Sequence, residues 1–210
     1  MKQTLYIFIS LFLSFIIILL PFFLLLFSQT FYHYEFNKLG VYEEENMIES
    51  KELNNKINES LQSLINFFLY KSNTISNYNE NEISHMKDVK KIFLVLEILL
   101  ILSLLILVLC MLKLSKQSLM QILKHSSIIS LLFFLILFLL TINFEQTFAA
   151  FHPIFFPQGN YTFNPDTSFM KFMFPDDFFL DFLIKSLSIS IVIAIIILFI
   201  SYNASKRSHE

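Results

Sequence analysis

The stretch IFLVLEILLILSLLILVLCML, residues 92–112, is long and apolar enough to cross a lipid bilayer. Its one charged residue, Glu97, lies near its start. At 1.5 Å per residue the stretch forms a helix of about 30 Å, which matches the hydrocarbon core of a bilayer. The sequence therefore predicts a transmembrane helix here.

Three further apolar stretches, at residues 1–27, 122–142 and 183–202, have a similar length. Hydrophobic residues make up 55% of the 210 residues, and the mean hydropathy is +0.63. The first stretch is too long for the apolar region of a signal peptide, and LLFSQTFYHYE after it offers no cleavage site with small residues. We therefore predict an all-α polytopic membrane protein with four transmembrane helices, the first of which is retained.

The short flanks at one end of these stretches are basic, and Glu210 is the only acidic residue there. Because Lys and Arg concentrate in cytoplasmic flanks, we expect both termini, the loop 113–121 and the tail 203–210 to be cytoplasmic. The segments 28–91 and 143–182 then form an extracytoplasmic cap. The basic residues of the cytoplasmic side are Lys2, Lys113, Lys116, Lys124, Lys206 and Arg207.

The outer segment 28–91 contains an amphipathic pattern, MIESKELNNKINESLQSLINFFLYK, at residues 47–71. Apolar residues recur there at spacings of three and four, which predicts a helix with one apolar stripe. We expect this helix to lie on the bilayer or on the mouth of the helix bundle. The stripe consists of Leu53, Ile57, Leu61, Leu64, Ile65, Phe68 and Leu69.

The outer segment 143–182 is dominated by phenylalanine, with twelve in the range 144–182. Such a segment is too apolar for a solvated linker. Its four prolines and Gly159 are expected to break it into short turns rather than one helix. We predict an aromatic-rich cap at the water–lipid boundary that lines a pocket. The four prolines are Pro153, Pro157, Pro165 and Pro175.

Two of the five histidines, His85 and His152, fall in the outer segments close to predicted membrane helices. Asp88 lies three residues after His85, on the same helical face, where a carboxylate can orient an imidazole. From the residues alone, catalysis and simple backbone capping both remain open for this pair. We interpret the other three as an interfacial anchor (His33) and solvated flanks (His125 and His209).

Several other chemistries have no signature in the chain. With two glycines, no phosphate-cradling loop and no Gly-x-Ser-x-Gly element is present. No His-x-x-x-His or Cys-x-x-Cys pattern occurs, and Cys110 is the only cysteine, so we expect no metal, no cofactor and no internal disulfide. No basic stripe suits a nucleic acid.

Three motifs together resemble the lipoprotein intramolecular transacylase (Lit) family. They are EISHMKDVKK (residues 82–91), FHPIFFPQGNYTFNPDT (residues 151–167) and FPDDFFLDF (residues 174–182). The resemblance covers essentially the whole chain. It implies an enzyme of the bacterial cell membrane that moves the sn-2 acyl chain of a diacylglyceryl lipoprotein onto the α-amino group of its lipidated cysteine, giving the lyso-form.

On this resemblance we expect His85 and His152 to be catalytic, with His85, oriented by Asp88, as the base and His152 as the oxyanion donor and acid. The implied partners are diacylglyceryl lipoproteins and membrane lipid, at the outer leaflet boundary, and we expect a monomer. Two alternatives remain: a non-enzymatic membrane partner or chaperone, and an intermolecular phospholipid acyltransferase. The expected substrate pocket consists of Phe148, Phe151, Phe155, Phe156, Tyr161 and Phe163.

Overall fold

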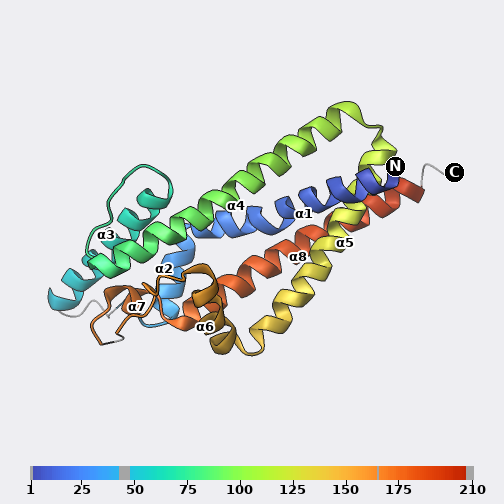
Figure 1. Cartoon of the computed structure of the whole chain (residues 1–210). Helices are drawn as coiled ribbons and strands as arrows, with labels where there is room; N and C mark the ends of the chain where they lie inside the picture. Colours follow the sequence, from blue (N-terminus) through green and yellow to red (C-terminus); the bar gives the residue numbers. More distant parts are fainter. Residues whose placement is uncertain (1, 43–47, 165, 207–210) are drawn as a thin grey trace. The chain divides into compact units, whose positions relative to one another are not determined.

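The computed structural model describes residues 2–42, 48–164 and 166–206, and helices account for most of them (Figure 1). Predictions that involve Pro165, Arg207, His209 and Glu210 fall outside the described residues. The helices are α1 (Lys2–Leu26), α2 (Gln29–Lys38), α3 (Ile48–Phe68), α4 (Glu80–Lys113), α5 (Lys116–Thr141), α6 (Phe144–Phe155), α7 (Phe169–Met173) and α8 (Asp176–Lys206).

Four of these helices, α1, α4, α5 and α8, are long and apolar enough to span a membrane, as predicted. Helix α4 is longer than the stretch that predicted it, because it begins at Glu80 rather than near residue 92. Many of its apolar side chains are exposed, among them Ile101, Leu105 and Leu112. Such exposure suits contact with lipid, since in water each apolar Å² would cost about 25 cal/mol.

The chain divides into two compact units. Unit 1 consists of residues 1–26, 93–142 and 182–210, and unit 2 consists of residues 27–92 and 143–181. The boundary falls inside α4 and inside α8, so each of these helices contributes its N-terminal part to unit 2 and the remainder to unit 1.

In unit 1, α1 packs along α5 through small polar residues. Ser10 and Ser126 are fully buried, and the Ser10 hydroxyl donates to the carbonyls of Tyr6, at 2.7 Å, and Ile122, at 3.1 Å. The Tyr6 hydroxyl donates to Ser118 Oγ at 3.0 Å. Small residues let helix backbones approach closely inside a membrane, where lipid tails compete equally well for apolar contacts.

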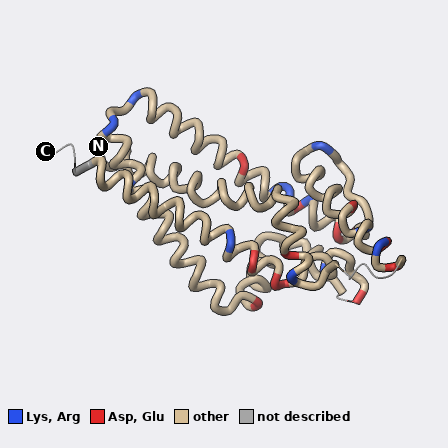
Figure 2. The backbone as a smooth tube through the Cα atoms, turned by 180° about the vertical axis from the view of Figure 1, so that it is seen from behind, with Lys and Arg blue, Asp and Glu red and all other residues tan. Residues whose placement is uncertain are grey.

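The apolar core of unit 1 joins three helices. Ile17 of α1, Phe134 of α5, and Leu187 and Ala194 of α8 form one buried cluster. Phe93 of α4 packs edge-on against Phe22 of α1, with ring centroids 5.7 Å apart. Figure 2 shows that the helices of unit 1 carry few charged residues along most of their length.

The core of unit 2 is aromatic. Tyr32 and Phe36 of α2 are buried against Phe174 and Phe178, with the Tyr32 and Phe178 rings stacked at 5.5 Å. Residues 174 and 178 belong to the phenylalanine-rich segment, so this part of it packs inside the unit as predicted for a non-solvated segment. The packing joins segments more than 130 residues apart in the sequence.

Helix α3 confirms the predicted amphipathic helix, but its apolar stripe is not lipid-facing. Ile57, Leu61, Leu64 and Ile65 are covered by other parts of the chain, and the exposed fraction of each side chain is 4% or less. Of the two predicted locations, the bilayer surface and the mouth of the helix bundle, the burial of these residues contradicts the first and leaves the second a prediction. Burial within the protein removes these side chains from water as lipid would, so the stripe pattern alone could not distinguish the two environments.

The phenylalanine-rich segment contains more helix than its prolines suggested. Helix α6 includes Pro153 instead of ending before it. Pro153 lies in the last turn of α6, where its missing N–H costs one backbone hydrogen bond without interrupting a longer helix. The residues after Phe156 turn at Gly159, whose φ of 77° favours glycine because other residues are strained there.

Candidate functional site

His85 and His152 lie next to each other in unit 2. His85 projects from the second turn of α4 and His152 from the last turn of α6. Their rings are stacked, with centroids 6.1 Å apart and planes inclined by 24°. Because 66 residues separate the two in the sequence, their approach follows from tertiary folding.

The two imidazoles differ in their hydrogen bonding. Nδ1 of His152 lies 2.6 Å from the carbonyl oxygen of Phe148, one helical turn earlier. A carbonyl oxygen can only accept, so Nδ1 of His152 carries the proton and a neutral ring has its free lone pair on Nε2. His85 is buried, with 6% of its surface exposed, and its Nδ1 has no hydrogen-bond partner among the described residues.

Aromatic rings surround His152. Phe148 meets its edge at 4.5 Å, Tyr161 lies at 5.0 Å and Phe151 at 5.6 Å, each measured between ring centroids. Phe148 and Phe151 belong to α6 itself, four residues and one residue before the histidine, whereas Tyr161 comes from the turn that follows. The local fold of residues 148–161 thus builds most of the enclosure.

The enclosure extends to His85 through two further phenylalanines. Phe156 is 2% exposed and lies 4.5 Å from the His85 ring and 5.7 Å from the His152 ring. Phe163 lies edge-on to His85 at 5.5 Å. Phe155 instead stacks on Phe151 at 4.3 Å and is half exposed. It supports the enclosure from outside.

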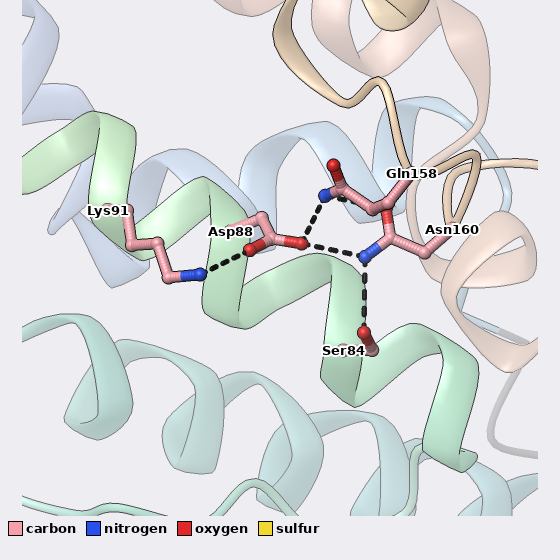
Figure 3. Close-up of polar contacts among 5 residues, drawn as sticks. All are labelled: Ser84, Asp88, Lys91, Gln158 and Asn160. Carbon is pink, nitrogen blue, oxygen red and sulfur yellow. Dashed lines mark hydrogen bonds and ion pairs between the residues drawn. The ribbon is translucent and has the colours of Figure 1, made fainter.

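Asp88 forms a polar cluster beside the histidines (Figure 3). Its Oδ2 accepts hydrogen bonds from Asn160 Nδ2, at 2.8 Å, and from Gln158 Nε2, and its Oδ1 pairs with Lys91 Nζ at 2.7 Å. Asn160 Nδ2 also donates to Ser84 Oγ at 3.1 Å. The hydrogen bonds of this carboxylate among the described residues therefore go to the 158–160 turn and to Lys91, and not to His85 as the sequence led us to expect.

Sequence reasoning missed Gln158 and Asn160. The available signal was the PQGN turn, in which two amides flank a glycine, together with the spacing of Ser84 and Asp88 by one helical turn. That spacing places both side chains on one face of α4, where a polar turn can dock. Nothing in the sequence specifies that residues 158–160 are the turn that docks there.

No group of three or more His, Cys, Asp and Glu side chains is arranged to hold a metal ion within the described ranges. The polar groups that face one another at this site are thus two imidazoles and a carboxylate–amide cluster, bordered by aromatic rings. Such a site can move protons and exclude water, which suits acyl transfer at an ester.

The model of the lipoprotein intramolecular transacylase Lit family matches residues 7–179. The chain belongs to this family. Lit-family transacylases are enzymes, so the protein is an enzyme, and its four candidate spans make it an integral membrane protein.

Solved structures of Lit from Bacillus cereus have the same fold as this Lit-family chain. The in meso structure of the membrane integral protein matches with a TM-score of 0.84 at 22% identity, covering 100% of this chain and 98% of that chain. Two structures of the same protein with an H85R or an H85A mutation match with a TM-score of 0.78, at 21% and 20% identity, covering 94% and 96% of those chains and all of this one. Comparison with curated proteins gave no match.

Proposed function

We propose that this Lit-family protein moves the sn-2 acyl chain of a diacylglyceryl lipoprotein onto the α-amino group of the lipidated N-terminal cysteine, giving the lyso-form. The observation that carries the proposal is the pair of stacked imidazoles, 6.1 Å apart, inside an enclosure of aromatic rings. Family membership supports the substrate class. The acyl chains and the aromatic side chains are chemically matched, since both avoid water.

The reaction is an isomerisation of one molecule. The amine nitrogen attacks the ester carbonyl carbon, so a C–N bond forms and the bond between the carbonyl carbon and the glyceryl oxygen breaks. The ammonium first loses one proton to water and becomes nucleophilic. The attacking nitrogen then loses a second proton to the base, and the base returns this proton to the departing glyceryl oxygen. The site must therefore supply this base and a donor that stabilises the oxyanion.

We assign the base role to His152 and the donor role to His85, which reverses the roles expected from the sequence. The hydrogen bond from His152 Nδ1 to the Phe148 carbonyl leaves Nε2 as the basic nitrogen of the neutral ring. The same bond stabilises the imidazolium that forms when Nε2 takes a proton. The ring of His85, which is stacked on that of His152, then donates its N–H to the oxyanion.

Positioning contributes more than proton transfer in this mechanism. Flexible bonds separate the amine from the ester, and holding them together can supply about 7–11 kcal/mol, whereas one acid–base group adds about 10²–10⁴-fold, or about 3–5 kcal/mol. The rings of Phe148, Phe151 and Phe156 are suited to hold the acyl chain in this way. They also exclude water, which would otherwise hydrolyse the ester.

The test is tandem mass spectrometry of a diacylglyceryl lipopeptide, deuterated in its sn-2 chain, incubated with the purified protein and unlabelled phospholipid. We expect a product of unchanged mass with the deuterated chain on the cysteine nitrogen. A gain of an unlabelled chain would identify an intermolecular acyltransferase, and loss of the labelled chain a lipase. An unreacted lipopeptide would refute the proposed reaction.

The same assay tests the histidines. We expect His85→Ala and His152→Ala each to abolish most of the conversion, by the 10²–10⁴-fold typical of one acid–base group. Each variant should still elute as a single folded species in detergent. Near-normal turnover of His152→Ala would show that His152 is a packing residue and would refute the mechanism.

A further inference from the structure

We propose that Asp88 is a positioning residue that acts through the turn after α6. Its carboxylate binds Gln158 and Asn160 and so fixes the turn against α4. The turn positions two aromatic rings next to the histidines. We call Asp88, Ser84, Gln158 and Asn160 the clasp. The effect on catalysis rests on the proposed transacylase function, whereas the clasp itself can be tested without it.

The clasp joins two segments that are far apart in the sequence. Asn160 Nδ2 spans Asp88 Oδ2, at 2.8 Å, and Ser84 Oγ, at 3.1 Å, so one amide bonds to two successive turns of α4. Gln158 Nε2 donates to the same Asp88 oxygen. Hydrogen bonds to a carboxylate are about twice as strong as neutral ones. The carboxylate therefore anchors a turn that contains the flexible Gly159.

The turn leads directly into the enclosure. Phe156, two residues before Gln158, lies 4.5 Å from the His85 ring. Tyr161, the residue after Asn160, lies 5.0 Å from the His152 ring. The clasp thus fixes the turn between two rings, of which Phe156 lies beside both histidines and Tyr161 beside His152. Loosening it would shift both rings relative to the imidazoles and to the acyl chain they hold.

Two other roles for Asp88 differ in what they require. Direct orientation of His85, or pairing with the substrate ammonium, would need a free carboxylate oxygen and a negative charge. Oδ2 is already occupied by two amides, and Oδ1 by Lys91, whose side chain is 76% exposed. The clasp needs an acceptor oxygen at Oδ2 and does not strictly need the charge.

This difference defines the variants. Asp88→Asn keeps an acceptor oxygen for the two amides but removes the charge, and Asp88→Ala removes both. Asn160→Ala breaks the clasp from the other side, because it removes the amide that donates to Asp88 and Ser84. Glu80→Gln is the matched control, because it removes an exposed negative charge from the first turn of the same helix.

In the lipopeptide assay we expect Asp88→Ala and Asn160→Ala to lower kcat roughly 10- to 100-fold, as small misplacements do, with KM changed less than about twofold. Asp88→Asn should stay within about threefold of the parent, since a neutral hydrogen bond replaces a charged one. The kcat of the double variant Asp88→Ala/Asn160→Ala should be no lower than that of either single variant. Equal losses in Asp88→Asn and Asp88→Ala would show that the charge matters and would overturn the clasp, as would a normal rate in Asp88→Ala.

Amide hydrogen exchange measures the clasp without any reaction. In Asp88→Ala and Asn160→Ala, peptides that cover residues 156–163 should exchange faster than in the parent, while peptides from α1 and α5 stay unchanged. Asp88→Asn and Glu80→Gln should leave the 156–163 segment protected. Unchanged exchange in Asp88→Ala would refute the clasp. If exchange responds as expected but the parent does not isomerise the lipopeptide, the clasp stands and the proposed function fails.

Discussion

His152 obtains its orienting group from its own helix. The Phe148 carbonyl, four residues earlier, accepts a hydrogen bond from His152 Nδ1 and so orients the imidazole. From the sequence we expected the carboxylate of Asp88 to orient His85 in the same way. Every helical residue has a carbonyl at this offset, so the sequence gives no sign of which histidine uses it. A side chain that can orient a histidine is identifiable in a sequence, whereas a backbone carbonyl that does so is not.

The proposed division of labour makes the two histidines act as a unit. The double variant His85→Ala/His152→Ala should convert lipopeptide no more than about threefold more slowly than the worse single variant, because removing one partner already disables the shared step. Single-turnover mass spectrometry measures the three rates. His33→Ala is the control, since His33 is exposed and bonds to Tyr42 instead of to the site. Losses that multiply in the double variant would indicate independent roles.

The site residues that could be predicted from the sequence are those whose residue type is unusual for the segment that contains them. His85 and His152 stand out as titratable groups in apolar outer segments, and five of the six expected pocket residues contact an imidazole ring. Phe155 does not, because it lies on the outer face of α6. Gln158 and Asn160 were missed because amides beside a glycine usually indicate only a turn.

At the level of the helices, Glu82 determines where α4 begins. Asn79 and Glu82 cap the helix reciprocally: Glu82 N–H donates to Asn79 Oδ1 at 3.0 Å, and Asn79 N–H donates to Glu82 Oε2 at 2.8 Å. The other oxygen of Glu82 accepts from Ser168 Oγ, at 2.6 Å, and from Met170 N–H, at 2.9 Å. One buried carboxylate therefore starts α4, three residues before His85, and holds the start of α7.

This arrangement predicts that Glu82→Gln destabilises the protein. Both oxygens of Glu82 accept from donors, so an amide in either orientation turns an NH₂ group toward a donor and leaves it unsatisfied, at a cost of about 1–3 kcal/mol. A loss of 1 kcal/mol lowers Tm by about 2–4 °C in a chain of this size. Thermal aggregation in detergent, followed by size-exclusion chromatography, measures the change. The exposed Glu80→Gln should keep the parent Tm, and a parent-like Tm for Glu82→Gln would contradict the role of this carboxylate.

The helices themselves show where sequence patterns suffice. The capping pair is readable in the sequence as Asn-x-x-Glu, residues 79–82, and it would have predicted the early start of α4. The period of α3 was equally readable, but the burial of Ile57 and Leu61 within the protein was not. An apolar stripe indicates that one face of a helix is shielded from water, but it does not indicate whether protein or lipid covers that face.

For the whole molecule, the distribution of charge separates the two units. The spans of unit 1 are nearly free of charge (Figure 2). Unit 2, in contrast, contains the ion pair of Lys38 with Asp181, at 2.5 Å, and the Asp88 cluster. Within unit 1, the start of α1 and the end of α8 lie beside the α4–α5 connection (Figure 1). That connection contains Lys113 and Lys116, so one end of the spans is basic, as the positive-inside rule requires of a cytoplasmic end.

Cysteine labelling tests this topology directly. Cys110 is buried in α4 and is the only cysteine, so Cys110→Ala gives a parent without thiols. In spheroplasts, an impermeant maleimide should label Ser76→Cys and Thr162→Cys, which are exposed positions of the two predicted outer segments, and should spare Lys116→Cys. Lysis should expose Lys116→Cys, because its position is solvent-accessible at the basic end of α5. Labelling of Lys116→Cys before lysis would place the basic end outside and would contradict the predicted topology.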